Sequence, residues 1–266
     1  LGEAQVQKAL PDGFYLLKPI SEAEIDDFEI KAETRRGRGA VPWNASPHAI
    51  LAQIEVALRQ IQALKPYLAP ELVERVVVHA RRRQVESEYR PTTVMFCNFV
   101  GPEILLDVWG AAGVQRITSV LNAYFSSMQD VIARYGGIIS RVDPYSKGTK
   151  MLVLFGAPVA HEDDPQRAVS AALAMNAELE VLDETWRRKF ARYLPPEHTS
   201  PLVQHRMGIT FGQTFAGQVG SATRREYTVM GDEVNLAARL MSVAEMGQIL
   251  IEQQVGKTVA DYFVVN

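Results

Sequence analysis

The stretch RREYTVMGDEVNLAARL, residues 224–240, carries the pattern that decides the fold. A β-like run, Tyr227–Met230, stops at a Gly-Asp pair, and a helical pattern follows at once. Asp232 is predicted to cap this helix, because its carboxylate can accept hydrogen bonds from the amides of the first turn. Asn235 and Arg239 are four residues apart, so both project from one face of the helix.

The opposite face of this helix is apolar enough to pack against a sheet, and it consists of Val234, Leu236, Ala237, Ala238 and Leu240. An amide and a guanidinium side by side at a strand-to-helix junction suit a polyphosphate ligand, because Arg offers a planar fork of donors to phosphate oxygens. The spacing alone is also typical of an Asn and an Arg on a solvated helix face.

Composition limits the classes of protein that the chain can belong to. Its 266 residues, 47% hydrophobic and 22% charged, suffice for one large domain or a domain with an appendage. A net charge of −3 gives no basic field for nucleic acid or an anionic membrane. The single cysteine, Cys97, excludes an intrachain disulfide and favours a reducing compartment, and the five histidines lack metal-ligand spacing. We therefore expect a cytoplasmic protein with neither nucleic-acid nor membrane partners.

Residues 227–240 resemble the class III nucleotidyl cyclases, the family of adenylate and guanylate cyclases. The family pattern is Tyr-Thr-Val-x-Gly-Asp-x-Val-Asn-x-Ala-Ala-Arg-Leu, and every fixed position is present here. The resemblance extends over residues 90–266, which we take as a cyclase homology domain truncated at its C-terminus. It implies an α+β fold with a ferredoxin-like split βαβ core.

The hydrophobic patterning of residues 90–266 agrees with that core, in the order strand, helix, strand, strand, helix, strand. Strands are expected at 92–98, 138–142, 150–155, 204–211, 214–219, 248–251 and 262–265, long helices at 114–134 and 168–182, and a surface linker at 186–200. The segment GQTFAGQVG, residues 212–220, is similar to the β-hairpin of the family.

Two further segments precede the domain. Residues 1–45 form an irregular segment with two short strands, 14–17 and 28–31, and resemble the tail of an upstream cyclase domain; we expect an internal fragment of a longer protein. Residues 46–89 form a helical linker, because Ser46-Pro47 is a helix start and apolar residues recur at helical spacing up to Ala63. A second helix is expected after Pro70.

The resemblance implies a site in which two aspartates hold two metal ions. At the first of these positions the chain has Asn98, within Phe-Cys-Asn-Phe-Val-Gly, and at the second it has Thr149, after Gly148. Both side chains are neutral, whereas a hard divalent ion depends on carboxylates. Asp143 offers a substitute in a hairpin longer than the family pattern, and Lys150 next to Thr149 disfavours a cation site.

The other half of the implied site is retained. Asn235 is expected to position the ribose, and Arg239 to neutralise charge that develops on the phosphates. Thr228 takes the base-reading position, and Arg141 replaces the usual Lys. Because the Glu/Cys pair that reads guanine is absent, adenine is favoured, although Arg and Lys differ in donor geometry.

The chain most resembles the second, metal-lacking domain of soluble-type, bicarbonate-responsive adenylate cyclases. This resemblance implies half of a composite site that converts ATP to cyclic AMP and pyrophosphate, with Mg²⁺ or Mn²⁺ supplied through a metal-bearing partner domain, upstream in the same polypeptide, or within a homodimer. The isolated chain is expected to be inactive or very weak. The alternative is a catalytically inactive domain that regulates or scaffolds a partner by binding nucleotide or a small anion.

Overall fold

A computed structural model describes residues 6–9, 15–17, 46–64, 72–73, 87–196, 198–221 and 225–264. The chain divides into two compact units, residues 1–57 and 58–266. In the first unit, β1 (Val6–Ala9) pairs antiparallel with β2 (Tyr15–Leu17). The strand expected at 14–17 is thus present as β2, β1 was not expected, and the strand expected at 28–31 lies outside the described residues.

The first linker helix, α2 (Pro47–Leu64), begins where its start signal lies. The Ser46 hydroxyl accepts a hydrogen bond from the Ala49 amide at 3.3 Å, as an N-cap residue does. Of the second expected helix only Leu72 and Val73 are described, and both are helical. A helical segment therefore precedes the sheet.

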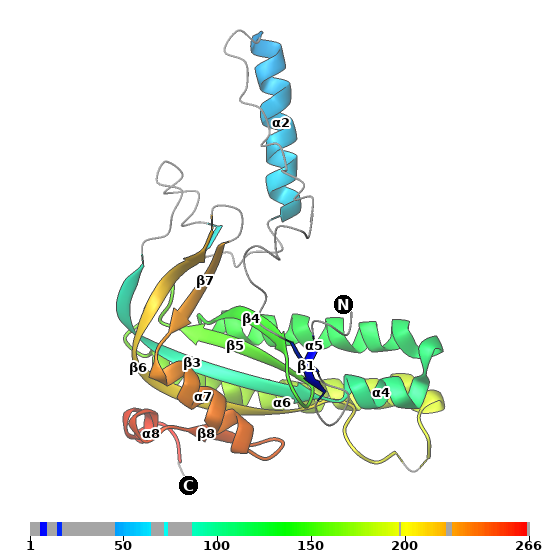
Figure 1. Cartoon of the computed structure of the whole chain (residues 1–266). Helices are drawn as coiled ribbons and strands as arrows, with labels where there is room; N and C mark the ends of the chain where they lie inside the picture. Colours follow the sequence, from blue (N-terminus) through cyan, green and yellow to red (C-terminus); the bar gives the residue numbers. More distant parts are fainter. Residues whose placement is uncertain are drawn as a thin grey trace. The chain divides into compact units, whose positions relative to one another are not determined.

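One sheet forms the centre of the second unit (Figure 1), with strand order β4-β5-β3-β6-β7. These neighbours pair antiparallel, and β8 adds to β6 in parallel. The strands are β3 (Glu88–Val100), β4 (Ile138–Pro144), β5 (Thr149–Phe155), β6 (Gln204–Gly220), β7 (Arg225–Met230) and β8 (Ile249–Ile251). The mixed α+β fold with an antiparallel sheet is as expected.

Successive side chains of β3 point to opposite faces of the sheet, so they belong to two apolar layers. Met95, Cys97 and Phe99 pack in the core beneath the long helices α5 (Val114–Arg134) and α6 (Asp164–Phe190). Val94 and Phe96 point to the opposite face, where α7 (Asp232–Val243) covers the sheet (Figure 1). Asn98 follows Phe96 on this α7 face.

The expectation of two strands around Gly212, and of a hairpin at 212–220, is wrong. β6 runs without interruption through Gly212, because its pairing with β3 extends from Gln204 opposite Val100 to Ala216 opposite Glu88. The glycine allows close helix packing here: a Cβ on Gly212 would lie 2.6 Å from a carboxylate oxygen of Glu233 in α7.

The expected end of the second long helix, at residue 182, is also wrong. α6 continues to Phe190, because Trp186 and Phe190 are buried and the Phe190 ring packs 5.3 Å from that of Trp109. Trp109 ends a helix that the pattern missed, α4 (Pro102–Trp109). Short 3₁₀ turns, Ala111–Gly113 and Ala191–Tyr193, follow α4 and α6.

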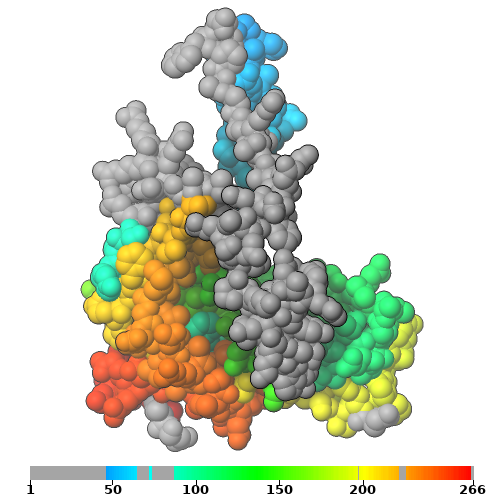
Figure 2. All heavy atoms as spheres, viewed as in Figure 1, coloured from blue at the N-terminus to red at the C-terminus, as the bar shows by residue number. Residues whose placement is uncertain are grey.

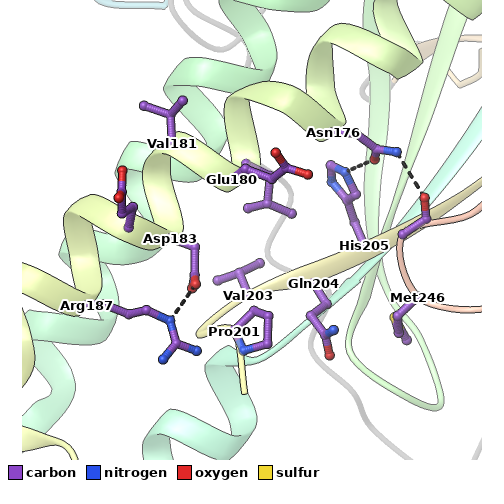
Figure 3. A pocket seen from close by; sticks show the side chains of 13 residues that line it. Asn176, Glu180, Val181, Asp183, Arg187, Pro201, Val203, Gln204, His205 and Met246 are labelled. Atoms are coloured by element: carbon purple, nitrogen blue, oxygen red, sulfur yellow. Dashed lines mark hydrogen bonds and ion pairs between the residues drawn. The ribbon is translucent and has the colours of Figure 1, made fainter. Parts of the chain in front are cut away.

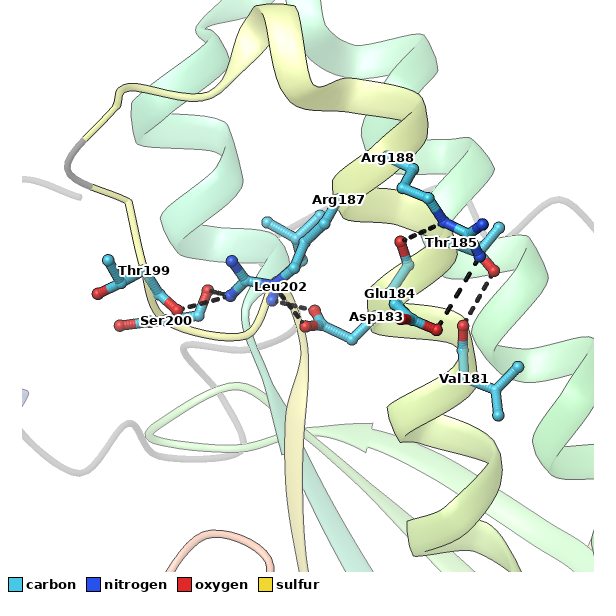
Figure 4. A network of polar contacts seen from close by, with 9 residues as sticks. All are labelled: Val181, Asp183, Glu184, Thr185, Arg187, Arg188, Thr199, Ser200 and Leu202. Atoms are coloured by element: carbon cyan, nitrogen blue, oxygen red, sulfur yellow. Dashed lines mark hydrogen bonds and ion pairs between the residues drawn. The ribbon is translucent and has the colours of Figure 1, made fainter.

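Side chains of α6 fasten the connection from α6 to β6 (Figure 4). The Asp183 carboxylate accepts a hydrogen bond from the Leu202 amide at 2.6 Å and forms an ion pair with Arg187 at 2.7 Å. Arg187 also donates to the carbonyl oxygens of Thr199, at 2.8 Å, and Ser200. The expected surface linker is therefore shorter than 186–200, and polar contacts tie its end to the helix.

Two local expectations near the C-terminus are corrected. Asp232 is the first helical residue of α7 and makes no side-chain cap bond, since Gly231 occupies the N-cap; its carboxylate still complements the helix dipole. The strand expected at 262–265 is not formed by its described residues, 262–264. α8 (Gln253–Val259) ends in a turn in which the Tyr262 and Phe263 amides both bond to the Val259 carbonyl oxygen.

Gly208 sets the distance between α7 and the sheet, and this yields a stability prediction. A Cβ at Gly208 would lie 2.3 Å from the Met241 nitrogen and 2.4 Å from the Ala237 oxygen, so it would collide with helix backbone. We expect Gly208→Ala to lower the free energy of unfolding by about 1–3 kcal/mol, as overpacking does. Urea denaturation measures the loss. Gly247→Asn is the control, because a Cβ added at Gly247 would have no atom within 4 Å and Asn tolerates its positive φ of 83°.

Candidate active site

The Asn235 and Arg239 pair lies on the exposed face of α7. Ala237 and Met241 on the opposite side of the helix are buried against β6, which fixes how the helix is rotated. Both polar side chains are exposed, and within the described part of the chain neither has a hydrogen-bond or ion-pair partner. Figure 2 shows the α7 segment, in orange, at the surface of the domain. The predicted pair is thus available to a ligand or to a partner domain.

The two predicted base-reading residues lie on strands at opposite ends of the sheet order, yet the sheet curls enough to bring these strands into contact. The Ser140 hydroxyl of β4 donates to the Tyr227 carbonyl of β7 at 3.3 Å. Arg141 reaches Glu226 at 3.5 Å, and Thr228 lies on the same face of β7 as Glu226. A register shift between Ile139 and Arg141 marks a bulge, a feature that redirects side chains. Arg141 and Thr228 therefore belong to one region.

Asp143, the substitute carboxylate, is engaged elsewhere. Its Oδ2 lies 2.8 Å from the Nε of Arg141, so the two side chains form an ion pair within β4. Arg141 thereby contacts two carboxylates, those of Asp143 and Glu226. The two ion pairs orient the guanidinium toward β7.

Asn98, at the first expected metal position, is fully buried, and its amide makes three hydrogen bonds. Its Nδ2 donates to the carbonyl oxygens of Lys147, at 2.8 Å, and Thr149, at 3.1 Å. Its Oδ1 accepts from Arg206 Nε at 3.1 Å. The amide thus ties the β4–β5 hairpin to β3 and β6, with both of its N–H donors and one acceptor position of its oxygen engaged.

The cross-strand register places positive side chains on both sides of Asn98. Lys150 of β5 and Arg206 of β6 stand directly opposite Asn98, and Asp143 stands opposite Lys150. In the described residues no group of three or more His, Cys, Asp and Glu side chains could hold a metal ion. The residues at this position therefore do not fit a divalent metal. Arg206 was not among the predicted residues, since only the strand register brings it to Asn98.

A pocket of about 650 Å³ lies away from these residues (Figure 3). It is lined by α6, by the start of β6 and by the turn before β8, and it includes none of the predicted site residues. His205 and Asn176 lie side by side in it, and Arg187 and Asp183 form an ion pair within it. Its polar groups largely bond to one another, so we assign the chemistry to the α7 face instead.

A buried polar chain connects this pocket to the core. His205 Nε2 lies 2.7 Å from Asn176 Oδ1, and its Nδ1 lies 3.1 Å from the Tyr124 hydroxyl, which is 3.7 Å from the Cys97 sulfur. Because Asn176 Nδ2 donates to Gly247 O, Oδ1 accepts from His205, and Nδ1 accepts from Tyr124. Burial lowers the pKa of His205 to about 4 and raises the pKa of Cys97 to about 12. Cys97 is thus an inert core thiol.

The model of the adenylate and guanylate cyclase catalytic domain family matches residues 85–264. The chain belongs to this family. It is 30% identical over 190 residues to the uncharacterised protein Rv1319c of Mycobacterium tuberculosis, a match that covers 71% of this chain and 31% of that protein. The cyclase domain thus spans less than a third of that relative.

Solved structures of two cyclases superpose on about two thirds of the chain. The adenylyl cyclase CyaB from P. aeruginosa is 31% identical with a TM-score of 0.57, covering 68% of this chain and 85% of that one. The guanylyl cyclase Cya2 is 30% identical with a TM-score of 0.55, covering 68% and 84%. In the described part of the chain no helix is long and apolar enough to cross a membrane.

The three hydrogen bonds of the buried Asn98 amide predict a large effect of its removal. Asn98→Ala would leave two carbonyl oxygens and Arg206 Nε without this partner in a partly buried position. We expect the free energy of unfolding to fall by about 2–3 kcal/mol, the cost of unsatisfied buried groups. Urea denaturation tests this, with Asn122→Ala on the exposed face of α5 as control. Equal midpoints for the two variants would contradict the role of Asn98.

The depressed pKa of His205 predicts a loss of stability in acid. The folded state keeps this histidine neutral to about pH 4, whereas an unfolded histidine takes up a proton near pH 6.5. The unfolded state therefore binds more protons between these values, and His205 makes stability fall by about 3 kcal/mol as pH drops from 6.5 to 4. Urea midpoints measured across this range should fall less steeply in His205→Gln than in the wild type. The exposed His48→Gln should retain the full slope.

Proposed function

We propose that this chain is the half of a class III adenylate cyclase that contributes base-recognition and transition-state residues, while a partner domain contributes the metal ions. The observation that carries the proposal is an asymmetry on one face of the sheet. Asn235 and Arg239 are exposed and have no side-chain partner among the described residues, whereas the Asn98 amide at the expected metal position is engaged in three hydrogen bonds. A site missing one half of its chemistry requires that half from elsewhere.

In this proposal the residues of α7 act on the sugar and the phosphates. Asn235 orients the ribose, so that its 3′-hydroxyl is aligned for attack on the α-phosphate. Arg239 donates hydrogen bonds to phosphate oxygens and stabilises the charge that develops as pyrophosphate leaves. Both side chains project from a helix held rigidly against the sheet, which favours precise positioning.

Thr228 and Arg141 face the base in this proposal. A threonine hydroxyl both donates and accepts, so it can serve the adenine edge. Arg141 replaces the lysine of the family and is oriented by Asp143 and Glu226. The similar structures include both an adenylyl and a guanylyl cyclase, so the choice of ATP rests on Thr228 and on the absence of a guanine-reading Glu/Cys pair.

The second candidate is a regulatory domain that binds nucleotide or a small anion without catalysis. The hydrogen-bonded amide of Asn98 favours this regulatory candidate, because the described residues at that position include no carboxylate pair that could hold a metal ion. Mg²⁺ or Mn²⁺ belongs to the partner in the first candidate and has no role in the second.

Activity measurements separate the two candidates. We expect cyclic AMP from ATP with Mn²⁺ only when the chain is mixed with a cyclase domain that carries both metal aspartates. Asn235→Ala and Arg239→Ala in this chain should lower kcat of the mixture by about 10²–10³-fold, as the loss of a transition-state donor does. Arg192→Ala, an exposed arginine of the 3₁₀ turn after α6, is the matched control.

Two other results would redirect the assignment. No activity in the mixture, with nucleotide still bound, would favour the regulatory candidate. Activity of the chain alone would contradict the mismatch at the metal position, and Asp143 would be the first residue to replace.

A further inference from the structure

Four side chains on adjacent strands form a row across the α7 face of the sheet. Asp143, Lys150, Asn98 and Arg206 are in register on β4, β5, β3 and β6. Directly paired residues of antiparallel strands point to the same side, so these side chains share one surface. The residue at the family's metal position therefore stands between an ammonium and a guanidinium.

Arg206 is held in place by hydrogen bonds that leave part of its guanidinium available. Nε donates to Asn98, and Nη1 donates to the carbonyl oxygens of Ser242 and Ala244 at the end of α7, at 3.1 and 2.9 Å. Those carbonyls carry the negative end of the helix dipole. Nη2 has no hydrogen bond within the described residues, so one edge of the guanidinium can still donate.

Lys150 has no carboxylate partner among the described residues. Its ammonium lies 5.7 Å from the ring centroid of Phe96 and 5.6 Å from that of Tyr145. Aromatic faces attract a cation without removing its hydrogen-bonding capacity. Asp143, the acidic member of the row, is paired with Arg141. The half-buried ammonium is therefore oriented but not neutralised.

We propose that Lys150 and Arg206 form a metal-independent binding site for a phosphate-bearing anion, at the position where other members of the family hold metal ions. The row supplies fixed positive charge in place of a divalent cation. The Cα atoms of Lys150 and Arg206 are two strand spacings apart, about 10 Å, and both side chains are long, so they suit a polyphosphate better than a single phosphate. The source is either free pyrophosphate or the polyphosphate of a nucleotide.

This site is separate from the Asn235 and Arg239 pair and does not depend on the proposed cyclase activity. It belongs to this chain alone, so it can be tested without a partner domain. Isothermal titration with pyrophosphate in EDTA is the direct measurement. We expect binding without metal, weakened at least tenfold in Lys150→Gln and within a few fold of wild type in Lys150→Arg.

Matched variants locate the binding. Lys257→Gln, on the exposed side of α8, and Arg192→Ala, in the 3₁₀ turn after α6, should each bind pyrophosphate within about twofold of wild type, whereas added salt should weaken binding. Circular dichroism of Lys150→Gln confirms that the variant is folded. Pyrophosphate binding by this chain alone tests the anion site, and cyclic AMP formation in the mixture tests the cyclase proposal, so the failure of one is distinguishable from the failure of the other.

The results that would overturn the proposal are specific. They are the absence of pyrophosphate binding in EDTA, binding that appears only with Mg²⁺, or equal affinity in wild type and Lys150→Gln. ATP identifies the source: affinity equal to that of pyrophosphate means that the phosphates alone are recognised, and tighter binding means that the nucleoside adds contacts. Binding of ATP without any binding of pyrophosphate would refute the site.

Discussion

The uninterrupted antiparallel pairing of β3 with β6 is the constraint on which the domain depends. The register runs from Val100 opposite Gln204 to Glu88 opposite Ala216. It therefore determines which of the two faces of the sheet each side chain of β3 occupies. A slip of one residue would turn Asn98 into the core beneath α5 and α6, and Cys97 out toward α7. The same register brings Arg206 to Asn98 and places Gly208 beneath the backbone of α7.

The strand pairing determines which charged side chains surround Asn98, at the expected metal position. In a metal site, carboxylates converge and their repulsion is relieved by the ion. Here a neutral amide satisfies the hairpin carbonyls, and two cations flank it. Hydrogen bonds of Asn98 therefore hold the hairpin to β3.

Local patterns predicted the elements whose residues repeat regularly. α5, β4, β5 and the start of α7 follow from periodicity and from the family motif, as does the exposure of Asn235 and Arg239. The errors arose where distant packing overrides local signals. Gly212 resembles a strand break, but it lies within β6 and leaves room for the Glu233 side chain. The polar end of α6 stays helical because Trp186 and Phe190 are buried. Arg206 could not be found, because no sequence spacing reports cross-strand partners.

Hydrogen bonds couple Asn98 to the helix that carries Asn235 and Arg239. Asn235 and Arg239 stand on a helix whose position is set by Gly208 and by Arg206, which bonds the carbonyls at its C-terminal end. Arg206 is in turn fixed by Asn98. Asn98 therefore supports, through the guanidinium of Arg206, the helix that carries Asn235 and Arg239. A change at Asn98 would disturb both the β4–β5 hairpin and the position of α7. The amide and the α7 pair are therefore structurally coupled.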